Sequence, residues 1–310
     1  MSTREAPATD PIALRPFRAH GYTVQVPENW LDLTTYAFRG PRLRDFNPVL
    51  CVQTESEVGF DSVEDYARAR LPLALRASSG GRLLRQEPMR LGSTHTGLTA
   101  EIRWSPGKDQ EYFQRILYAL FENRGLVVSC HLTRHARAAR GESIRRLFEA
   151  FRPYGAAFRS SRPSSWIGDS FRIDLPEGWT DMSTILLAEP EPDRFRRNLV
   201  IRRILEPEAP DDLRPWAENE IEILKKAAKG FELIEHKETT TADQGFAQKI
   251  VFLRDTDSGD RVRQTEVAAW RAGAMHVLLA TTEVEPPRRI ARLIEPMLRS
   301  FSASKGGERN

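Results

Sequence analysis

Alternating apolar and polar residues predict strands at two equivalent places in this chain of 310 residues. Residues 22–26 (YTVQV) carry an apolar side chain at every second position, and residues 171–175 (FRIDL) do the same. This period is typical of a strand with one buried face. Pro27 and Pro176, 149 positions apart, follow the two runs and are expected to end the strands, because proline has no amide hydrogen for the ladder.

The pattern continues in the same order after both prolines. A second short strand is predicted at 34–38 and 183–187, and a third at 47–52 and 198–201. Each half then has a predicted helix, starting at Asp61 or Asp211, and closes with a helix whose apolar residues recur at i, i+3, i+4 and i+7. These residues are Ile144, Leu147, Phe148 and Phe151 and, 150 positions later, Ile294, Met297, Leu298 and Phe301. The near-constant offset predicts a tandem duplication.

The first helix of each half carries end signals. Ser62 and Asp65 resemble a capping box, and Gly230 is expected to end the helix that starts at Asp211. Pro72 is expected to kink or shorten the helix that starts at Asp61, because an interior proline removes a hydrogen bond.

The remaining segments predict an antiparallel α+β fold. About four strands follow each of these helices, with equivalent hairpin turns at 105–110 (SPGKDQ) and 255–260 (DTDSGD). The order β-β-β-α-β-β-β-β-α needs mostly hairpin connections, which favours two tandem domains, each an antiparallel sheet with flanking helices. The expected division of the chain is a flexible lead (1–16), a first domain (17–153), a linker (154–165), a second domain (166–303) and a polar tail (304–310).

Composition narrows the function classes. The chain is 40% apolar and 29% charged, and its net charge of +3 is small beside 46 basic and 43 acidic residues. The charges are interleaved, which indicates solvated faces rather than a nucleic-acid-binding stripe. Cys51 and Cys130 lie in apolar strand-like runs and are expected to be buried thiols, with a disulfide left open.

The N-terminal sequence lacks the apolar core of a secretory signal, and no run approaches the roughly 20 apolar residues that a transmembrane helix needs. We therefore expect a soluble cytoplasmic protein without direct membrane insertion.

Few residues suggest catalytic chemistry. His131 and His135 form HxxxH, which on one helix could hold a metal, but His131 ends a predicted strand and no further ligand stands at a suitable spacing. The acidic pairs Glu28 with Asp32, and Glu177 with Asp181, occur in both halves and could do acid–base work. The structural alternative is that each Asp accepts backbone N–H bonds in a turn while a Trp fills the corner. We favour this alternative and expect no enzyme activity, no metal and no cofactor.

The repeated motif is similar to that of the DcrB-related family. It reads apolar-x-apolar-Pro-x-x-Trp-x-Asp-x-Ser/Thr, followed by a strand that begins with Asn. Its residues here, which we expect to be structural, are Pro27, Trp30, Asp32 and Asn47 in the first half and Pro176, Trp179, Asp181 and Asn198 in the second. The resemblance covers almost the whole chain, twice, and implies a Mog1/PsbP-like fold for each half.

The family includes the Eag-type chaperones of type VI secretion. Those proteins hold apolar N-terminal helices of secreted effectors, help to load them on the secretion spike, and act as dimers that form a cupped groove. The resemblance therefore implies an effector partner, and possible spike components, for a monomer whose two halves form a built-in pseudo-dimer. The alternative is a generic protein-interaction module of Mog1-like fold with no preference for apolar helices.

A groove for an apolar helix is expected at the strand after each Trp. In the second half this strand is apolar on both alternating faces, which is more than a one-sided strand needs. The expected groove residues are Tyr36, Ala37 and Phe38 in the first half and Ile185, Leu186 and Leu187 in the second. Ordinary core packing is the alternative for each of them.

Overall fold

The computed structural model describes residues 12–19, 22–42, 46–56, 58–78, 80–91, 95–107, 110–121, 123–149, 151–153, 165–167, 171–175, 177–190, 196–205, 210–271 and 273–303. The chain divides into two compact units. Unit 1 comprises Met1–Trp30 and Ala188–Asn310, and unit 2 comprises Leu31–Leu187. Most of the predicted linker, residues 154–164, and the predicted tail, 304–310, lie outside the described residues.

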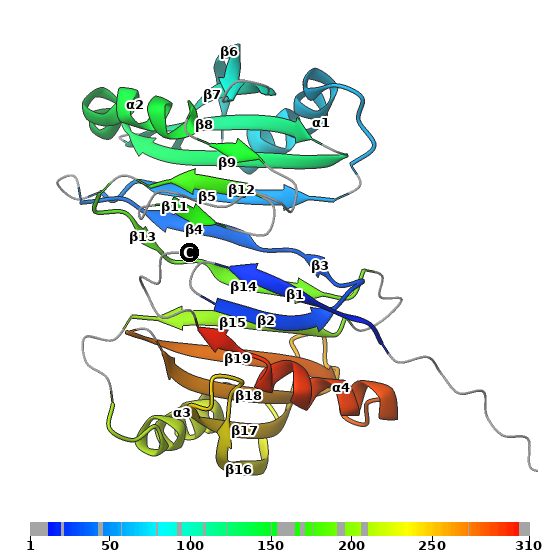
Figure 1. Cartoon of the computed structure of the whole chain (residues 1–310). Helices are drawn as coiled ribbons and strands as arrows, with labels where there is room; N and C mark the ends of the chain where they lie inside the picture. The colour runs from blue at the N-terminus through cyan, green and yellow to red at the C-terminus, as the bar shows by residue number, and fades with distance from the viewer. Residues whose placement is uncertain are drawn as a thin grey trace, which may run out of the picture. The chain divides into compact units, whose positions relative to one another are not determined.

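The main sheet of unit 2 is antiparallel, with the order β14-β4-β5-β9-β8-β7-β6 (Figure 1). Its strands are β4 (Thr35–Arg39), β5 (Val49–Glu55), β6 (Arg82–Leu91), β7 (His95–Gly107), β8 (Gln110–Phe121), β9 (Arg124–Thr133) and β14 (Thr184–Ala188). Short strands β3 (Leu31–Asp32) and β13 (Thr180–Asp181) pair with β14 and β4. A small separate sheet contains β10 (Arg152–Pro153), β11 (Ser165–Ile167) and β12 (Phe171–Asp174).

Helices α1 (Val63–Ala77) and α2 (Arg134–Glu149) cover opposite faces of the unit 2 sheet. Tyr66 of α1 packs among apolar residues that include Ile102 and Tyr118, whereas Arg137 of α2 reaches Glu101, which points to the other face. Tyr66 can approach β9 closely because residue 125 is glycine: a Cβ there would lie 2.5 Å from the tyrosine ring. The Oγ of Ser62 accepts the N–H of Asp65 at 3.1 Å, so the predicted cap of α1 is confirmed.

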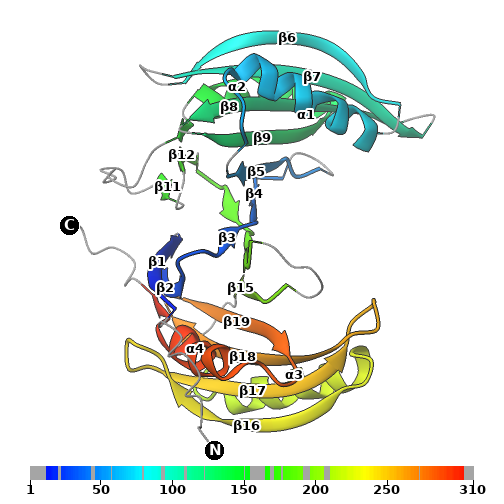
Figure 2. The same ribbon diagram turned by 90° about the vertical axis from the view of Figure 1, so that its right-hand side faces the viewer.

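The main sheet of unit 1 has the corresponding order β15-β19-β18-β17-β16 and is also antiparallel. Its strands are β15 (Asn198–Ile204), β16 (Glu232–Thr240), β17 (Phe246–Asp255), β18 (Arg261–Arg271) and β19 (Ala274–Glu283). Figure 2 shows β6 and β16 as the outer edges of their respective sheets. The hairpin turns predicted at 105–110 and 255–260 join β7 to β8 and β17 to β18, as expected.

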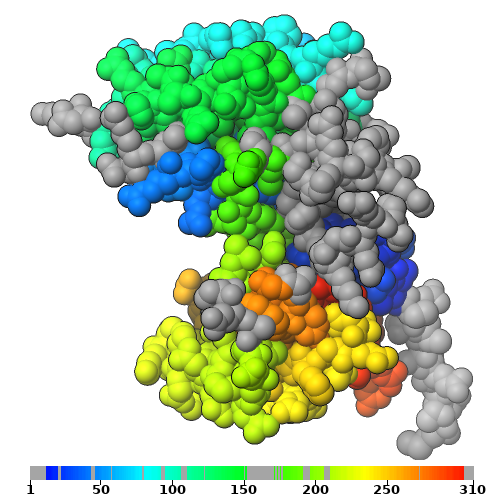
Figure 3. Space-filling view, turned by 60° about the vertical axis from the view of Figure 1, so that its left-hand side comes forward, coloured from blue at the N-terminus to red at the C-terminus, as the bar shows by residue number. Residues whose placement is uncertain are grey.

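Helices α3 (Arg214–Ala227) and α4 (Arg288–Arg299) belong to unit 1. Ala217 and Ile221 of α3 pack on Ile250 and Phe252 of the sheet, and α3 lies at the surface of unit 1 in the space-filling view (yellow-green, Figure 3). Helix α4 packs on β19 and on β2 (Tyr22–Pro27), which forms a small sheet with β1 (Leu14–Ala19) and β20 (Ser302–Ala303).

The N-terminal strands of the chain therefore pair within unit 1. β1 begins at Leu14, inside the segment expected to be a flexible lead, and β2 pairs with β20 near the C-terminus. The compact units thus differ from the predicted domains 17–153 and 166–303, because β1 pairs with β2 and β2 pairs with the last strand.

The structure confirms an α+β protein with large antiparallel sheets. The eight apolar residues of the two predicted closing stripes are all buried. The origin of the halves by duplication and the Mog1/PsbP-like fold stay predictions.

Candidate functional site

The two copies of the repeated motif meet in unit 2, where β4 and β14 pair antiparallel with Thr35 opposite Thr184. The Ala37 N–H donates to Ser183 Oγ at 3.1 Å, and the Leu186 N–H donates to Thr34 Oγ1 at 3.0 Å. These two bonds are related by the offset of 149 positions between the motifs. We call this arrangement the motif crossing, and it has local two-fold character.

Backbone bonds repeat this symmetry. The Leu33 N–H donates to the Leu186 carbonyl and the Met182 N–H donates to the Ala37 carbonyl, both at 2.8 Å. A single register therefore runs through the crossing, so residues opposite one another point to the same face of the sheet.

The motif aspartates hold turns. Asp32 accepts the Thr34 N–H on Oδ1 at 3.0 Å and the Tyr36 hydroxyl on Oδ2 at 2.6 Å. Asp181 Oδ1 accepts the Ser183 N–H at 2.8 Å and the Ser183 hydroxyl at 2.5 Å. These bonds are the ones that the structural interpretation of the acidic pairs predicts.

The two motif asparagines donate side-chain hydrogen bonds to backbone carbonyls. The side-chain amide of Asn47 donates to the Gly40 carbonyl, and that of Asn198 to the Arg196 carbonyl, each at 3.1 Å. Trp30 is buried and its N–H donates to the carbonyl of Pro27 at 3.0 Å. Pro176 lies outside the described residues, and Trp179 is half-buried.

The six expected groove residues divide between the two faces of β4 and β14. Tyr36, Phe38, Ile185 and Leu187 are buried in the core, whereas Ala37 and Leu186 are half-buried on the other face. Strand alternation explains this division, because neighbouring side chains point in opposite directions.

Sequence reasoning missed two residues on the half-buried face. The register of the motif crossing places Leu33 opposite Leu186 and Met182 opposite Ala37, so all four share one face. Leu33 is 38% exposed and Met182 is 50% exposed. Their signal in the sequence was an apolar residue retained at the offset of 149. We call Leu33, Ala37, Met182 and Leu186 the open-face patch.

The DcrB family model matches residues 172–292, which run from β12 into α4 and cover less than half of the chain. This segment is therefore similar to the DcrB family. The matched segment carries Asp181, Ser183 and Leu186, which the second motif contributes to the motif crossing. No curated protein sequence matches the chain significantly.

Solved structures match nearly the whole chain. An apo immunity protein, TplEi, of the type VI secretion system of Pseudomonas aeruginosa has 14% identity and a TM-score of 0.53, over 94% of this chain and 97% of that one. TplEi bound to an "L" peptide has 12% identity and a TM-score of 0.51, over 96% and 100%. A chain of the Tle4–Tli4 complex has 13% identity and a TM-score of 0.53, over 96% and 99%. At these identities the likeness concerns the fold.

The histidines and cysteines that were considered as candidate reactive or metal-binding residues do not come together in one site. His131 lies in β9 and His135 in α2, and no group of three or more His, Cys, Asp or Glu side chains among the described residues could hold a metal ion. Both cysteines are free thiols: Cys51 lies opposite Ser129 and Cys130 opposite Leu50, so the two thiols point to opposite faces of the sheet. Burial raises the pKa of the Cys130 thiol to about 12, which keeps it protonated.

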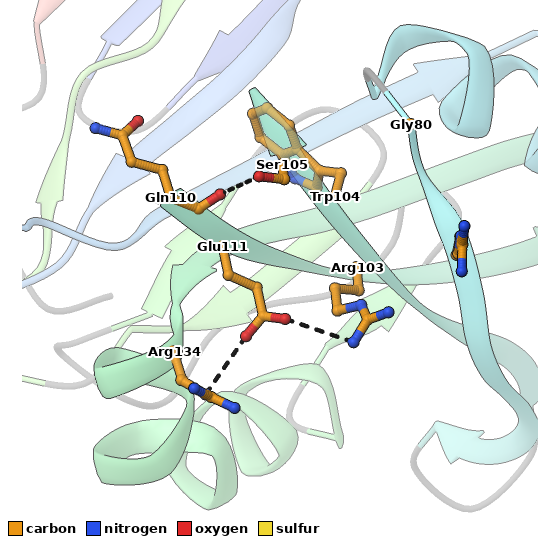
Figure 4. A pocket seen from close by; sticks show the side chains of 8 residues that line it. Gly80, Arg103, Trp104, Ser105, Gln110, Glu111 and Arg134 are labelled. Atoms are coloured by element: carbon orange, nitrogen blue, oxygen red, sulfur yellow. Dashed lines mark hydrogen bonds and ion pairs between the residues drawn. The ribbon is translucent and has the colours of Figure 1, made fainter. Parts of the chain in front are cut away.

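A broad pocket of about 550 Å³ in unit 2 is polar (Figure 4). Glu111 lies between Arg103 and Arg134, with N–O distances of 3.5 and 3.4 Å. Figure 4 shows both guanidinium groups turned toward this one carboxylate. Arg134 is mostly exposed, so this cluster is a solvated ion-pair network rather than a preorganised catalytic site.

None of the helices in the described part of the chain combines the length and apolar character needed to span a bilayer.

Proposed function

We propose that this protein is a non-enzymatic binding protein for an effector of a type VI secretion system. The observation that carries this proposal is the whole-chain likeness in fold to an immunity protein of that system and to a chain of the Tle4–Tli4 complex. The hydrogen bonds that hold Asp32 and Asp181 in turns support a structural rather than a catalytic role for the repeated motif.

We further propose that the open-face patch contacts apolar helices of the effector, as a chaperone would. Water penalises exposed apolar surface by roughly 25 cal/mol per Å², so an unassembled transmembrane helix gains from any apolar cover. Leu33 and Met182 supply exposed apolar surface beside Ala37 and Leu186. Methionine adapts its shape easily, which suits a surface that binds helices of varied sequence.

The alternative function within the same system is neutralisation of a folded effector domain. The likeness in fold to an immunity protein and to a chain of the Tle4–Tli4 complex favours this second candidate. The two functions differ in which part of the effector is held, so a truncation separates them.

The test is affinity capture of the tagged chain from its native cells, followed by mass spectrometry. We expect one type VI effector to be enriched. Deleting the apolar N-terminal helices of that effector should abolish capture if the protein is a chaperone and leave it intact if the protein is an immunity protein. Recovery of partners unrelated to secretion would contradict both functions and favour a generic interaction module.

A matched pair of variants tests the patch itself. Met182→Asp should abolish capture, whereas Ile223→Asp should not, because Ile223 is an apolar residue of similar exposure (48% against 50%) that lies on α3, outside the patch. If the patch variant captures the effector as well as the Ile223 control does, the open-face patch is not the binding surface, although effector binding itself still stands.

A further inference from the structure

Unit 2 contains a second pocket, of about 140 Å³, beside the tryptophan of the second motif. We call it the Trp179 pocket. Its buried lining comes from Pro48, Ile144 and Leu147, and Trp179 itself is half-buried. Trp179 lies so close to Gly40 that a Cβ there would be 2.9 Å from the indole, which fixes the position of the ring. A cavity of about this volume accepts a benzene-sized group.

The mouth of the Trp179 pocket is polar and lies at the surface. Arg140 and Ser143 come from exposed positions of α2, and Glu177 is exposed as well. In the space-filling view, the green surface around α2 adjoins the blue segment that includes β5 (Figure 3). The pocket is therefore an apolar recess that opens to solvent through charged and polar side chains.

The residues of unit 1 at the corresponding sequence positions are apolar and buried. The offset of 150 aligns Arg140 with Ile290 and Ser143 with Leu293, while Trp179 aligns with Trp30 at 149. Ile290 and Leu293 are buried at 4% and 8% exposure on α4, which packs against β2, and Trp30 is 4% exposed. At these aligned positions unit 1 has two buried aliphatic side chains, whereas unit 2 has an exposed arginine and an exposed serine that line a pocket.

We infer that the Trp179 pocket receives one aliphatic side chain, of leucine or isoleucine size, from a bound partner protein. Burial of such a side chain is favourable by the transfer of its apolar surface from water. Residues that carry much of the binding energy at protein interfaces lie in well-packed, desolvated pockets, surrounded by contacts that exclude water. This inference rests on the proposed function, because an effector is the partner that would bring the side chain.

The first test uses a small probe and needs no partner. N-acetyl-leucinamide carries the side chain and two neutral amides, and N-acetyl-alaninamide is the matched control probe. Saturation-transfer NMR on the full chain should show millimolar binding of the leucine probe and binding of the alanine probe weaker by about tenfold. Equal binding of the two probes, or no binding of the leucine probe, would overturn the inference.

Two substitutions copy unit 1 into unit 2. Ser143→Leu should fill the pocket, abolish binding of the leucine probe and raise Tm by about 2–4 °C. Arg140→Ile should do the same if Ser143→Leu fails to fold. Ala139→Leu, at an exposed position of α2 that does not line the pocket, is the control and should change neither quantity. Retention of probe binding in both pocket variants would contradict the inference.

Effector capture then links the pocket to the proposed function. Loss of capture with Ser143→Leu, and not with Ala139→Leu, places the anchor in the effector interface. If the leucine probe binds but no effector is captured, the proposed function is refuted, whereas the inference that the Trp179 pocket binds an aliphatic side chain still stands. Effector capture unaffected by Ser143→Leu would refute the anchor and keep the function.

Discussion

The layers under α1 in unit 2 and under α3 in unit 1 share a strand order but differ in chemistry. Ile116 lies under α1 among apolar and aromatic residues, and the residue 150 positions later, Glu266, lies 2% exposed on the corresponding strand. Burial, together with the charge of Glu220, raises the pKa of Glu266 to about 7, and Arg202 opposes this shift. At aligned positions, unit 1 therefore has an ionisable side chain and unit 2 has an aliphatic one.

The opposite faces of the two sheets differ in the sign of their buried charge. In unit 2, Glu101 is buried and receives two hydrogen bonds from Arg137, at 2.6 and 3.2 Å. In unit 1, Lys249 is buried and lies 3.1 Å from Glu235 and 3.2 Å from Glu295. Both charges are paired, as buried charges must be. The comparison shows that this face of the sheet accepts a buried charge of either sign when the charge has an oppositely charged partner.

The largest predicted effect concerns the two motif tryptophans. Trp30→Ala should lower the free energy of unfolding by about 3–5 kcal/mol, because it empties a fully buried site. Trp179→Ala should lower it by about 1–2 kcal/mol, because that ring is half-buried beside an open pocket. Urea unfolding followed by far-ultraviolet circular dichroism measures both. Equal losses would show that the two sites are packed alike.

The next effect is a gain. Glu266→Ile should stabilise the protein by roughly 3 kcal/mol above pH 7. The folded protein keeps the Glu266 proton at pH values between the ordinary pKa of 4.5 and about 7, whereas the unfolded chain releases it. The free energy of unfolding of the wild type should therefore fall relative to the variant as pH rises through this window. Stability curves of the two proteins that stay parallel from pH 4 to pH 8 would contradict the prediction.

The sequence predicted the elements of the fold better than their partners. Periodicity predicted both closing stripes, and turn residues predicted both hairpins, because faces and turns are local properties. The sequence did not predict that β2 pairs with the last strand, since strand partners depend on long-range pairing that no local pattern encodes. Pro72 was expected to kink or shorten the first helix, and it does not shorten it: α1 continues to Ala77, and Leu71, Ala74 and Leu75 pack on the sheet around the proline. The kink stays a prediction.

The sequence assigns the expected groove to two strands but not to one face of them, and the groove itself stays a prediction. β4 and β14 were identified as the strands of interest, yet both faces of β14 are apolar in sequence, so only the register shows that Ala37 and Leu186 point away from the core. The Trp179 pocket had a signal, because Arg140 and Ser143 replace two aliphatic residues of the other half. The sequence alone does not show that this difference creates a pocket, because only the structure places α2 beside Trp179.

A smaller effect should follow from breaking the buried ion pair of unit 2. Arg137→Met should lower the free energy of unfolding by about 2 kcal/mol at pH 7, because it leaves the Glu101 carboxylate buried with its more distant arginines. Burial raises the pKa of the Glu101 carboxyl, but the hydrogen bonds and charge of Arg137 outweigh this effect and hold that pKa below its ordinary value. The loss should therefore shrink as pH falls through that lowered pKa.

The matched change in unit 1 is Glu295→Gln. It should have less effect, about 1 kcal/mol, because Lys249 keeps Glu235 as a partner. Urea unfolding at pH 7 and at acidic pH measures both variants. If Glu295→Gln lowers the free energy of unfolding more than Arg137→Met does, Glu235 does not compensate for the loss of Glu295 as a partner of Lys249, and the prediction is wrong.

The smallest effect distinguishes the two motif aspartates. Asp32→Ala removes the acceptor of the Thr34 N–H and of the hydroxyl of Tyr36, a buried side chain, and should cost about 1–2 kcal/mol. Asp181→Ala removes bonds from the Ser183 N–H and hydroxyl, which lie nearer to solvent, and should cost about 1 kcal/mol. Glu177→Ala, at an exposed position of the same motif, is the control and should stay within about 0.5 kcal/mol of the wild type. Because all three variants remove one carboxylate, a loss common to all of them would assign the effect to net charge, whereas the expected ranking in urea unfolding would assign it to the turn bonds of the motif crossing.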